Sequence, residues 1–347
     1  MTGRERSFAA MNFQKPDMPA AHFLYSPPGF LAYGEKFNEL LAKYVGDDSG
    51  FTPWEIPVLK PEQLDETGRY YEIKNDEWGT TWEYRVYGAW GHPIKFPLAD
   101  LEAVKEYVFP KPPDYVTDAK AREARRLSII EHKKKYLSRM SLNGGDFFQN
   151  LIGTRGFENA LCDLVTEDSR LIDYLDRLCE YNLKITEAAA ELKPDVFNLS
   201  DDYGTNDDLI FSKEIFTAQF LPRWKKVIKP LKDAGIHVYF HSCGKVDKLF
   251  ESFKEMGVDS IWPQQPAYSM RYLADKCRDM RLGVAIHTDR GETMQRGTPE
   301  DVRELVGKEM EIYRPQDGGS WFHIEIDHGF PYENTKVLIE AIFSYRK

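Results

Sequence analysis

The chain has 347 residues, of which 42% are hydrophobic and 29% charged, as in an ordinary globular protein that buries a sizeable core. Its net charge of −10 argues against nucleic acid or an acidic membrane as the main partner. Four scattered cysteines do not suggest a disulfide framework, and no apolar run approaches membrane-spanning length. We therefore expect a soluble, cytoplasmic protein with reduced thiols and no apolar signal segment at its start.

The first third of the chain has irregular patterning. We expect a short helix over residues 4–11, a strand over 21–25 and a helix over 36–44. Residues 46–97 are rich in turn-forming and aromatic residues without a helical period, which indicates hairpins or a long excursion. A further helix is expected over residues 98–107.

From about residue 118, short apolar strands alternate with long amphipathic helices. Ser169 and Thr298 are the expected N-caps of two of these helices, and Pro299 suits the first helical position. The expected strands cover residues 140–142, 196–199, 237–241, 260–262, 284–286 and 321–326. The expected helices cover residues 118–136, 156–164, 169–192, 213–234, 246–256, 270–280 and 334–345, with one more starting at Thr298.

This alternation predicts parallel β/α architecture. A (β/α)8 barrel fits best, as a single domain over residues 1–347 with residues 46–97 as an irregular decoration. No glycine-rich nucleotide fingerprint follows an early strand, so a dinucleotide-binding fold is disfavoured. In such a barrel, the active site lies at the carboxyl ends of the strands.

One strand end carries metal-binding chemistry. His241 and Cys243 are two residues apart, so they project to the same side if the strand remains extended, and an imidazole beside a thiol supplies two of the four ligands of tetrahedral zinc. The motif is weak alone, because a packed strand end with a hydrogen-bonded histidine and an inert, buried cysteine gives the same pattern. Polar residues also stand at the ends of three other strands: Asp202, Tyr203 and Asn206; Asp289; and Glu325, Asp327 and His328. His323 lies within the last of these strands and shares a face with Glu325 and Asp327 if residues 321–327 are extended.

Several short stretches are each weak alone but specific when taken together in this order. They are Arg4-Glu5-Arg6 with residues 10–17, Asp76-Glu77-Trp78-Gly79, Arg155-Gly156-Phe157-Glu158-Asn159, Asp201-Asp202-Tyr203-Gly204-Thr205-Asn206, His241-Ser242-Cys243-Gly244, Gly297-Thr298-Pro299-Glu300 and Glu333-Asn334. Through them the chain resembles the uroporphyrinogen decarboxylase superfamily over nearly its whole length, which implies a (β/α)8 barrel. True uroporphyrinogen decarboxylases have an arginine cluster around the first strand, and residues 22–29 lack it here. The chain is therefore more similar to the corrinoid-linked zinc methyltransferase branch.

That branch implies zinc bound by His241, Cys243 and a third residue at the end of the last strand. The thiol-activating members have a cysteine there, whereas this chain has no cysteine beyond Cys277. The expected substitute is His328, with Glu325, His323 and Asp327 as alternatives, because zinc also accepts nitrogen and oxygen ligands.

The resulting prediction is a zinc-dependent methyltransferase. It would move a methyl group between a small methylated substrate, such as an aryl methyl ether, and a corrinoid on a partner protein. Asp202 and Asp289 are the expected catalytic residues, and the substrate-binding residues are expected to be Tyr203, Asn206, Trp78 and Trp82, although either tryptophan can instead fill the core. The alternatives are a metal-independent decarboxylase that uses Asp202 or Asp289 as its acid/base group, and a non-catalytic barrel.

Overall fold

A curved sheet of parallel strands forms the centre of the computed structural model, which describes residues 1–25, 27–142 and 144–347. Within these residues the sheet has seven strands in the order β1-β10-β9-β8-β7-β6-β5, and every pairing is parallel. The strands are β1 (Ala21–Tyr25), β5 (Arg139–Ser141), β6 (Val196–Ser200), β7 (His237–Ser242), β8 (Ser260–Pro263), β9 (Gly283–His287) and β10 (Ser320–Ile326).

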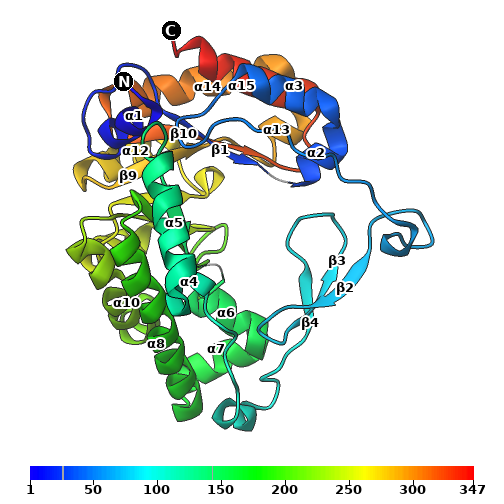
Figure 1. Cartoon of the computed structure of the whole chain (residues 1–347), viewed down its shortest axis with the longest axis vertical. Coiled ribbons are helices and arrows are strands. Elements are labelled where there is room, and N and C mark those ends of the chain that lie inside the picture. The colour runs from blue at the N-terminus through cyan, green and yellow to red at the C-terminus, as the bar shows by residue number, and fades with distance from the viewer. Residues whose placement is uncertain (26, 143) are drawn as a thin grey trace.

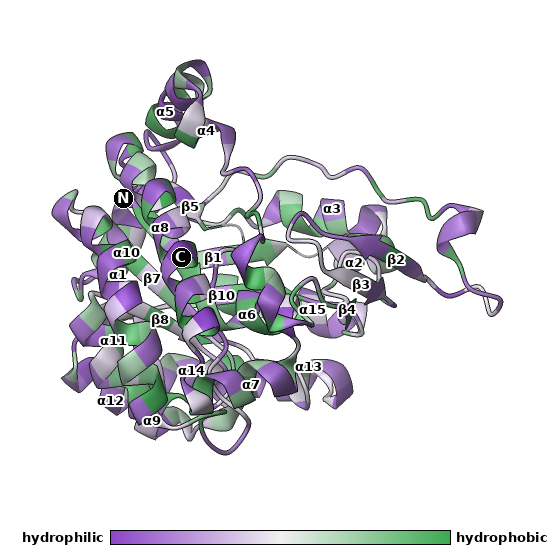
Figure 2. Ribbon diagram, turned by 90° about the horizontal axis from the view of Figure 1, so that it is seen from below, coloured by the Kyte–Doolittle hydropathy of each residue, from purple (hydrophilic) through white to green (hydrophobic). Residues whose placement is uncertain are grey.

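Helices surround this sheet (Figure 1). In Figure 2 many of them have a hydrophobic face and a hydrophilic face, which is the pattern of helices that cover a sheet. Their bounds are α1 (Gly3–Met11), α2 (Pro27–Tyr33), α3 (Glu35–Lys43), α4 (Asp114–Thr117), α5 (Ala119–His132), α6 (Phe147–Arg155), α7 (Phe157–Thr166), α8 (Ser169–Leu192), α9 (Lys213–Ile215), α10 (Leu221–Asp233), α11 (Phe250–Met256), α12 (Met270–Asp279), α13 (Thr293–Arg296), α14 (Pro299–Tyr313) and α15 (Tyr332–Ser344).

The place of an eighth strand, between β1 and β5, is taken by a short irregular segment around Asp47. The Asp47 N–H donates to the Ala21 carbonyl of β1 (2.8 Å), and the Asp47 carbonyl accepts from Leu137, just before β5 (3.3 Å). One residue thus bridges the two edge strands. The architecture is that of a (β/α)8 barrel, as expected from the sequence, with one position reduced to this bridge.

The irregular stretch folds as a separate antiparallel sheet of β2 (Glu72–Asn75), β3 (Thr81–Tyr84) and β4 (His92–Lys95). It lies beside the barrel, and the segment between α3 and β2 projects outward (Figure 1). The predicted excursion is therefore confirmed, but the predicted helix over residues 98–107 is wrong, because only Leu101–Lys105 forms a 3-10 turn. Its start is fixed at Leu101 because Asp100 is the N-cap, with a side chain that accepts from the Glu102 N–H (3.0 Å).

Two helix starts test the capping predictions. Thr298 caps α14 in a full capping box with Asp301, and Pro299 occupies the first turn, as predicted. Ser169 is not the cap of α8: Asp168 takes that role, because its side chain accepts from the Arg170 N–H (2.9 Å). Aspartate and serine are both common N-cap residues, and the prediction placed the cap at Ser169, one residue too late.

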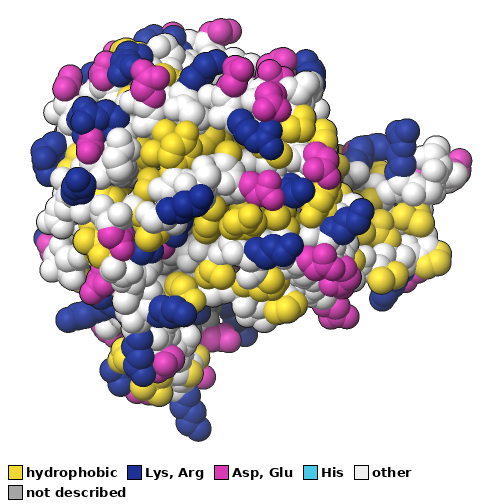
Figure 3. Space-filling model, turned by 90° about the horizontal axis from the view of Figure 1, so that it is seen from above, with side chains coloured by type: hydrophobic (Ala, Val, Ile, Leu, Met, Phe, Trp, Pro, Cys, Tyr) yellow, Lys and Arg dark blue, Asp and Glu magenta, His cyan; other side chains and the backbone are white. Residues whose placement is uncertain are grey.

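The surface is polar and mixed in charge. On the face shown in Figure 3, acidic and basic side chains are intermixed, and hydrophobic side chains are exposed among them. In the described residues, no helix is long and apolar enough to cross a membrane.

Candidate functional site

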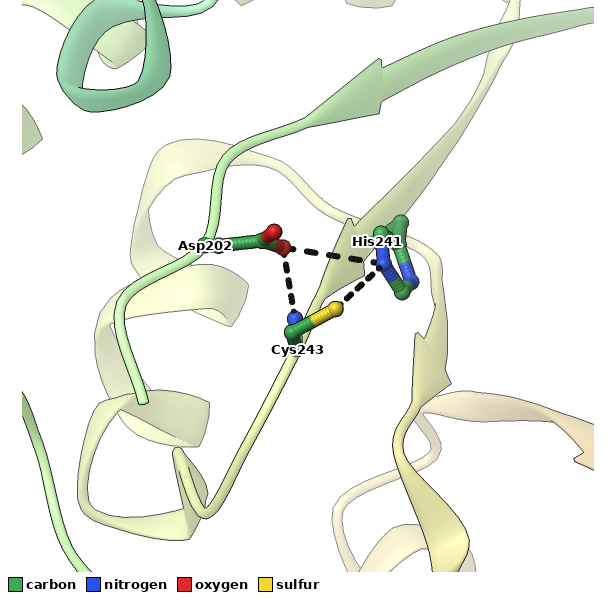
Figure 4. A group of neighbouring side chains, drawn as sticks. All are labelled: Asp202, His241 and Cys243. Carbon is green, nitrogen blue, oxygen red and sulfur yellow. Dashed lines mark hydrogen bonds and ion pairs between the residues drawn. The ribbon is translucent and has the colours of Figure 1, made fainter. Parts of the chain in front are cut away.

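Two neighbouring strand ends build the site. Parallel pairing sets Ser200 of β6 against His241 of β7. Asp202 lies two residues after Ser200, and Cys243 lies two residues after His241. Both side chains therefore project at the carboxyl ends of the strands, beside the imidazole of His241 (Figure 4). The sequence-predicted projection of His241 and Cys243 to the same side is therefore present.

The three side chains are close enough to share one ion. His241 Nε2 lies 3.3 Å from Cys243 Sγ and 3.6 Å from Asp202 Oδ1. One ligand atom from each residue lies within 4.8 Å of the other two, and the cluster is partly buried. Ligand atoms around tetrahedral zinc are roughly 3.4 to 3.6 Å apart, given bonds of about 2.0 to 2.3 Å, so the residues present fit such an ion.

His241 is held in the tautomer that a metal requires. Its Nδ1 lies 2.8 Å from the Trp262 carbonyl oxygen, which can only accept, so Nδ1 carries the proton and Nε2 presents a lone pair to Cys243 and Asp202. Burial lowers the pKa of His241, which keeps the ring neutral. The Trp262 ring also lies against the imidazole, with centroids 4.1 Å apart.

Asp202 and Cys243 are also held in place. The Asp202 carboxylate accepts from the Cys243 N–H at Oδ1 (2.8 Å) and from the Gln149 side-chain amide at Oδ2 (2.7 Å). Burial, followed by the Asp202 charge, raises the pKa of the Cys243 thiol to about 12. A thiol in this setting ionises when a cation binds, and the negative carboxylate beside it favours that cation.

Two glycines allow the loops after β6 and β7 to approach this closely. A Cβ on Gly244 would lie 2.2 Å from the Gly204 carbonyl carbon, and a Cβ on Gly204 would lie 2.6 Å from the Lys245 nitrogen. Gly244 also has a φ of +75°, which other residues rarely adopt. Backbone packing therefore explains the glycine in each of the two sequence motifs.

The side chains expected to supply the third ligand have other partners. Glu325 contacts His287 Nε2, and its Oε1 lies 3.5 Å from Arg290. Asp327 contacts Arg290 and His328, and His328 is half exposed. In the described part of the chain, none of these residues joins the cluster of Asp202, His241 and Cys243.

His323 is the remaining alternative, and it lies deeper in the barrel. It is buried, and neither ring nitrogen has a hydrogen-bond partner among the described residues. Its ring centroid is 4.3 Å from that of Trp262, so this indole lies between His323 and His241.

The predicted substrate-binding and catalytic residues differ in burial and in their hydrogen-bond partners. Tyr203 is fully buried, where it donates to Asp201 and accepts from Trp224, while Asn206 is exposed in the loop after β6. Asp289 accepts from three backbone N–H groups of residues 291–293 and shapes its own loop.

The two tryptophans of the excursion have separate surroundings. Trp78 belongs to the core, with its ring against Phe109 and Tyr181. The Trp82 indole donates to Asp76 (2.7 Å), and its ring lies 6.0 Å from that of Trp90.

Sequence reasoning missed the two groups that orient the cluster. Gln149 lies on α6, a helix that the pattern did not predict, and Asp201 accepts from its N–H (2.8 Å). The Trp262 carbonyl carries no sequence signal at all. Asp202 was expected to be catalytic rather than a metal ligand, although its place beside the H-x-C strand could have been found by pairing β6 with β7 in parallel register.

Comparison with known proteins agrees with this architecture. A methyltransferase from Methanosarcina mazei superposes with a TM-score of 0.65 at 14% identity, covering 100% of both chains. A dihydropteroate synthase from Xanthomonas albilineans (TM-score 0.34, 10% identity, 47% of this chain and 57% of that one) and a xylanase from Paenibacillus barcinonensis (0.35, 9%, 62% and 92%) are too dissimilar to support an argument.

The family comparison covers more than half of the chain. No curated protein matches the sequence. The model of the family described as uroporphyrinogen decarboxylase (URO-D) matches residues 147–345, which include the cluster at β6 and β7. The chain therefore belongs to the uroporphyrinogen decarboxylase family.

Proposed function

We propose that this protein is a zinc-dependent methyltransferase, which moves a methyl group between a small methylated substrate, such as an aryl methyl ether, and a corrinoid on a partner protein. The convergence of Asp202, His241 and Cys243 at the strand ends carries the proposal. The similar fold of a protein described as a methyltransferase supports it.

In this proposal, Asp202 is the third protein ligand in place of His328. The carboxylate oxygen lies in the cluster, whereas the ring of His328 faces the Asp327 carboxylate. Zinc held by one sulfur, one nitrogen and one carboxylate oxygen supplies a Lewis acid with an open fourth position, suited to the heteroatom that carries or receives the methyl group.

The residues around the cluster would hold its geometry. The Trp262 carbonyl fixes the lone pair of His241, and Gln149 fixes one oxygen of Asp202 so that the other faces Cys243. Outer partners of this kind set ligand orientation and typically account for about 10- to 100-fold in metal affinity. The corrinoid supplies the cobalt that carries the methyl group on the partner protein.

The test is zinc content after equilibration with zinc and gel filtration. We expect close to one zinc per chain in the wild type, and loss of zinc in Asp202→Asn and in His241→Ala. His328→Asn is the matched control and should keep its zinc. A control that loses zinc while Asp202→Asn retains it would overturn the ligand assignment in favour of His328.

Activity is tested with zinc-loaded protein, free methylcobalamin and a panel of phenols and thiols as acceptors. We expect zinc-dependent methylation of at least one acceptor, lost in His241→Ala. A wild type that binds no zinc, or activity on a carboxylated substrate that persists after chelation, would instead favour metal-independent decarboxylation.

A further inference from the structure

A second polar site lies at β5, the edge strand of the barrel sheet. It is a cavity of about 150 Å³ with side chains from α4, α5, β5 and β6 in its wall. The lining residues are Tyr115, Arg125, Arg139, Met140, Ser141 and Asn198. None of them belongs to the cluster of Asp202, His241 and Cys243.

Two hydrogen-bond donors in this cavity lack an acceptor. The Tyr115 hydroxyl is buried without a hydrogen-bond partner among the described residues, and the buried Arg139 Nε has only the Asp48 carboxylate nearby, at 3.8 Å and beyond hydrogen-bond distance. Buried polar groups are nearly always paired, so two orphan donors in one cavity indicate a missing acceptor. Burial also raises the pKa of Tyr115 to about 12, so its hydroxyl keeps its proton at neutral pH.

The Arg139 guanidinium is fixed in position. Its Nη2 donates to His22 Nδ1 (2.6 Å), its Nη1 is 3.4 Å from the Asn198 side-chain oxygen, and its plane lies over the Tyr239 ring. A rigid guanidinium loses little side-chain entropy when it binds a further acceptor.

The charge of the cavity is positive. Arg125 is a second guanidinium and forms no ion pair among the described residues, unlike its neighbour Arg126, which is paired with Glu123. The only carboxylate paired with Arg139 in the described residues is Asp48, at 3.8 Å. Two permanent positive charges against one carboxylate leave a net attraction for an anion.

The cavity and the metal cluster lie on neighbouring strands of the same sheet. Ser141 pairs with Asn198 on β6, and Ser200, two residues further along the same face, pairs with His241. Strand geometry puts the Cα atoms of Asn198 and His241 roughly 8 Å apart. A molecule of about one ring can span that separation.

We propose that this cavity binds the oxyanion group of the substrate, a carboxylate, sulfonate or phosphate, held by Arg139, Arg125 and Tyr115. The substrate class is then a small methylated acid, with its anionic end at β5 and its reacting heteroatom toward His241. The link to methyl transfer rests on the proposed function, whereas anion binding by the cavity does not.

Calorimetric titration of the whole protein tests this proposal, with benzoate, benzenesulfonate and phenyl phosphate as anionic probes and benzamide as the neutral one. We expect at least one anion to bind about tenfold tighter than benzamide, and the tightest to identify the oxyanion. Arg125→Gln should lower the affinity for that anion by about threefold to tenfold, and Tyr115→Phe should lower it severalfold. Arg126→Gln is the matched control on the same helix and should bind like the wild type.

The titration is repeated on zinc-free protein and on Asp202→Asn. Retained anion preference there, with no zinc bound by the wild type, would leave the subsite standing while the proposed function fails. Zinc binding with equal affinity for benzoate, its anionic analogues and benzamide would overturn the subsite alone. Wild-type affinity in both Arg125→Gln and Tyr115→Phe would also overturn it.

Discussion

At the scale of single residues, the orientation of Asp202 is a property of its neighbours. One carboxylate oxygen accepts from Gln149 and the other from the Cys243 N–H, so the side chain cannot rotate away from His241 without losing both bonds. Gln149 is itself fixed, because Asp201 accepts from its N–H at the start of α6.

This arrangement predicts that Gln149→Leu weakens zinc binding by about 10- to 100-fold, because the freed carboxylate oxygen turns toward water. Competition with a zinc-binding dye measures the affinity. Gln63→Leu, on the exposed excursion, is the control. A change in Gln149→Leu no larger than in the control would show that Asp202 is oriented without the amide.

The residue types of this cluster could be predicted from sequence, but their partners could not. The H-x-C spacing placed His241 and Cys243 correctly, since side-chain direction alternates along any strand. The choice of Asp202 over His328 depends on where Arg290 lies: it binds Asp327, which in turn holds His328. Such a competition between ion pairs leaves no trace in the spacing of residues.

At the scale of elements, the loops after β6 and β7 fit together through their backbones. Gly204 and Gly244 touch where any Cβ would collide with main-chain atoms, and the Lys245 N–H donates to the Thr205 carbonyl (2.7 Å) across the same contact. The two motifs therefore act as one structural unit that sets the spacing of Asp202 and Cys243.

We predict that Gly244→Ala destabilises the protein by about 3 kcal/mol or more, because backbone strain and a backbone collision add. Gly68→Ala is the matched control: its φ of +78° is nearly the same, but no atom lies within 4 Å of an added Cβ, so it should cost only about 1 to 2 kcal/mol. Urea unfolding measures both. Equal losses would mean that the two loops separate at little cost.

Sequence periodicity predicted elements well where tertiary packing agrees with it. Strands β6 to β10 and helix α8 match their expected ranges to within a few residues, and α14 begins where expected. The helix expected over residues 213–234 is a continuous helical run in which α9 and a π-helical turn over residues 216–220 precede α10. Helix α6 was missed because it is largely buried, so it lacks the polar face from which a period is recognised. The eighth strand position was not predictable, because it consists of the hydrogen bonds of a single residue, Asp47.

At the scale of the whole molecule, Asp47 joins three distant segments. Its buried carboxylate pairs with Arg6 of α1 (2.5 Å) and Arg346 after α15 (2.7 Å), and accepts from the Ala21 N–H of β1 (2.9 Å). The backbone of the same residue bridges β1 to the segment before β5. Closure of the barrel and docking of α1 and residue 346 thus meet at one residue, whose backbone makes the bridge and whose carboxylate holds the two arginines.

Asp47→Asn should therefore cost about 3 to 5 kcal/mol of unfolding free energy, since it removes the only carboxylate paired with Arg346 among the described residues and the more buried of the two paired with Arg6. The control is Asp17→Asn, which removes the more exposed partner of Arg6 and should cost no more than about 1 kcal/mol. Chemical denaturation followed by circular dichroism gives both values. If the two variants lost comparable unfolding free energy, the Asp47 carboxylate would not be the group that holds these segments together.

A buried carboxyl on α14 makes the stability of the whole molecule depend on pH. Glu309 is 1% exposed, and its Oε2 has no hydrogen-bond partner among the described residues. Burial, followed by the charge of Asp289, raises its pKa to about 8. In the unfolded chain the group titrates near 4.3. Between these values the folded state holds a proton that the unfolded state releases, so stability falls as pH rises from about 4.3 to 8.

Glu309→Gln removes this dependence, because the amide keeps the shape of the protonated acid and never ionises. We expect it to match the wild type near pH 4 within about 1 kcal/mol, where the acid is protonated in both states, and to exceed it at pH 8.5 by on the order of 2 kcal/mol or more. Glu311→Gln, an exposed position on the same helix, controls for the change in net charge. Urea unfolding at the two pH values separates them. If the unfolding free energies of Glu309→Gln, Glu311→Gln and the wild type change with pH in parallel, then water reaches the carboxyl of Glu309. Other groups would then set the pH dependence of stability.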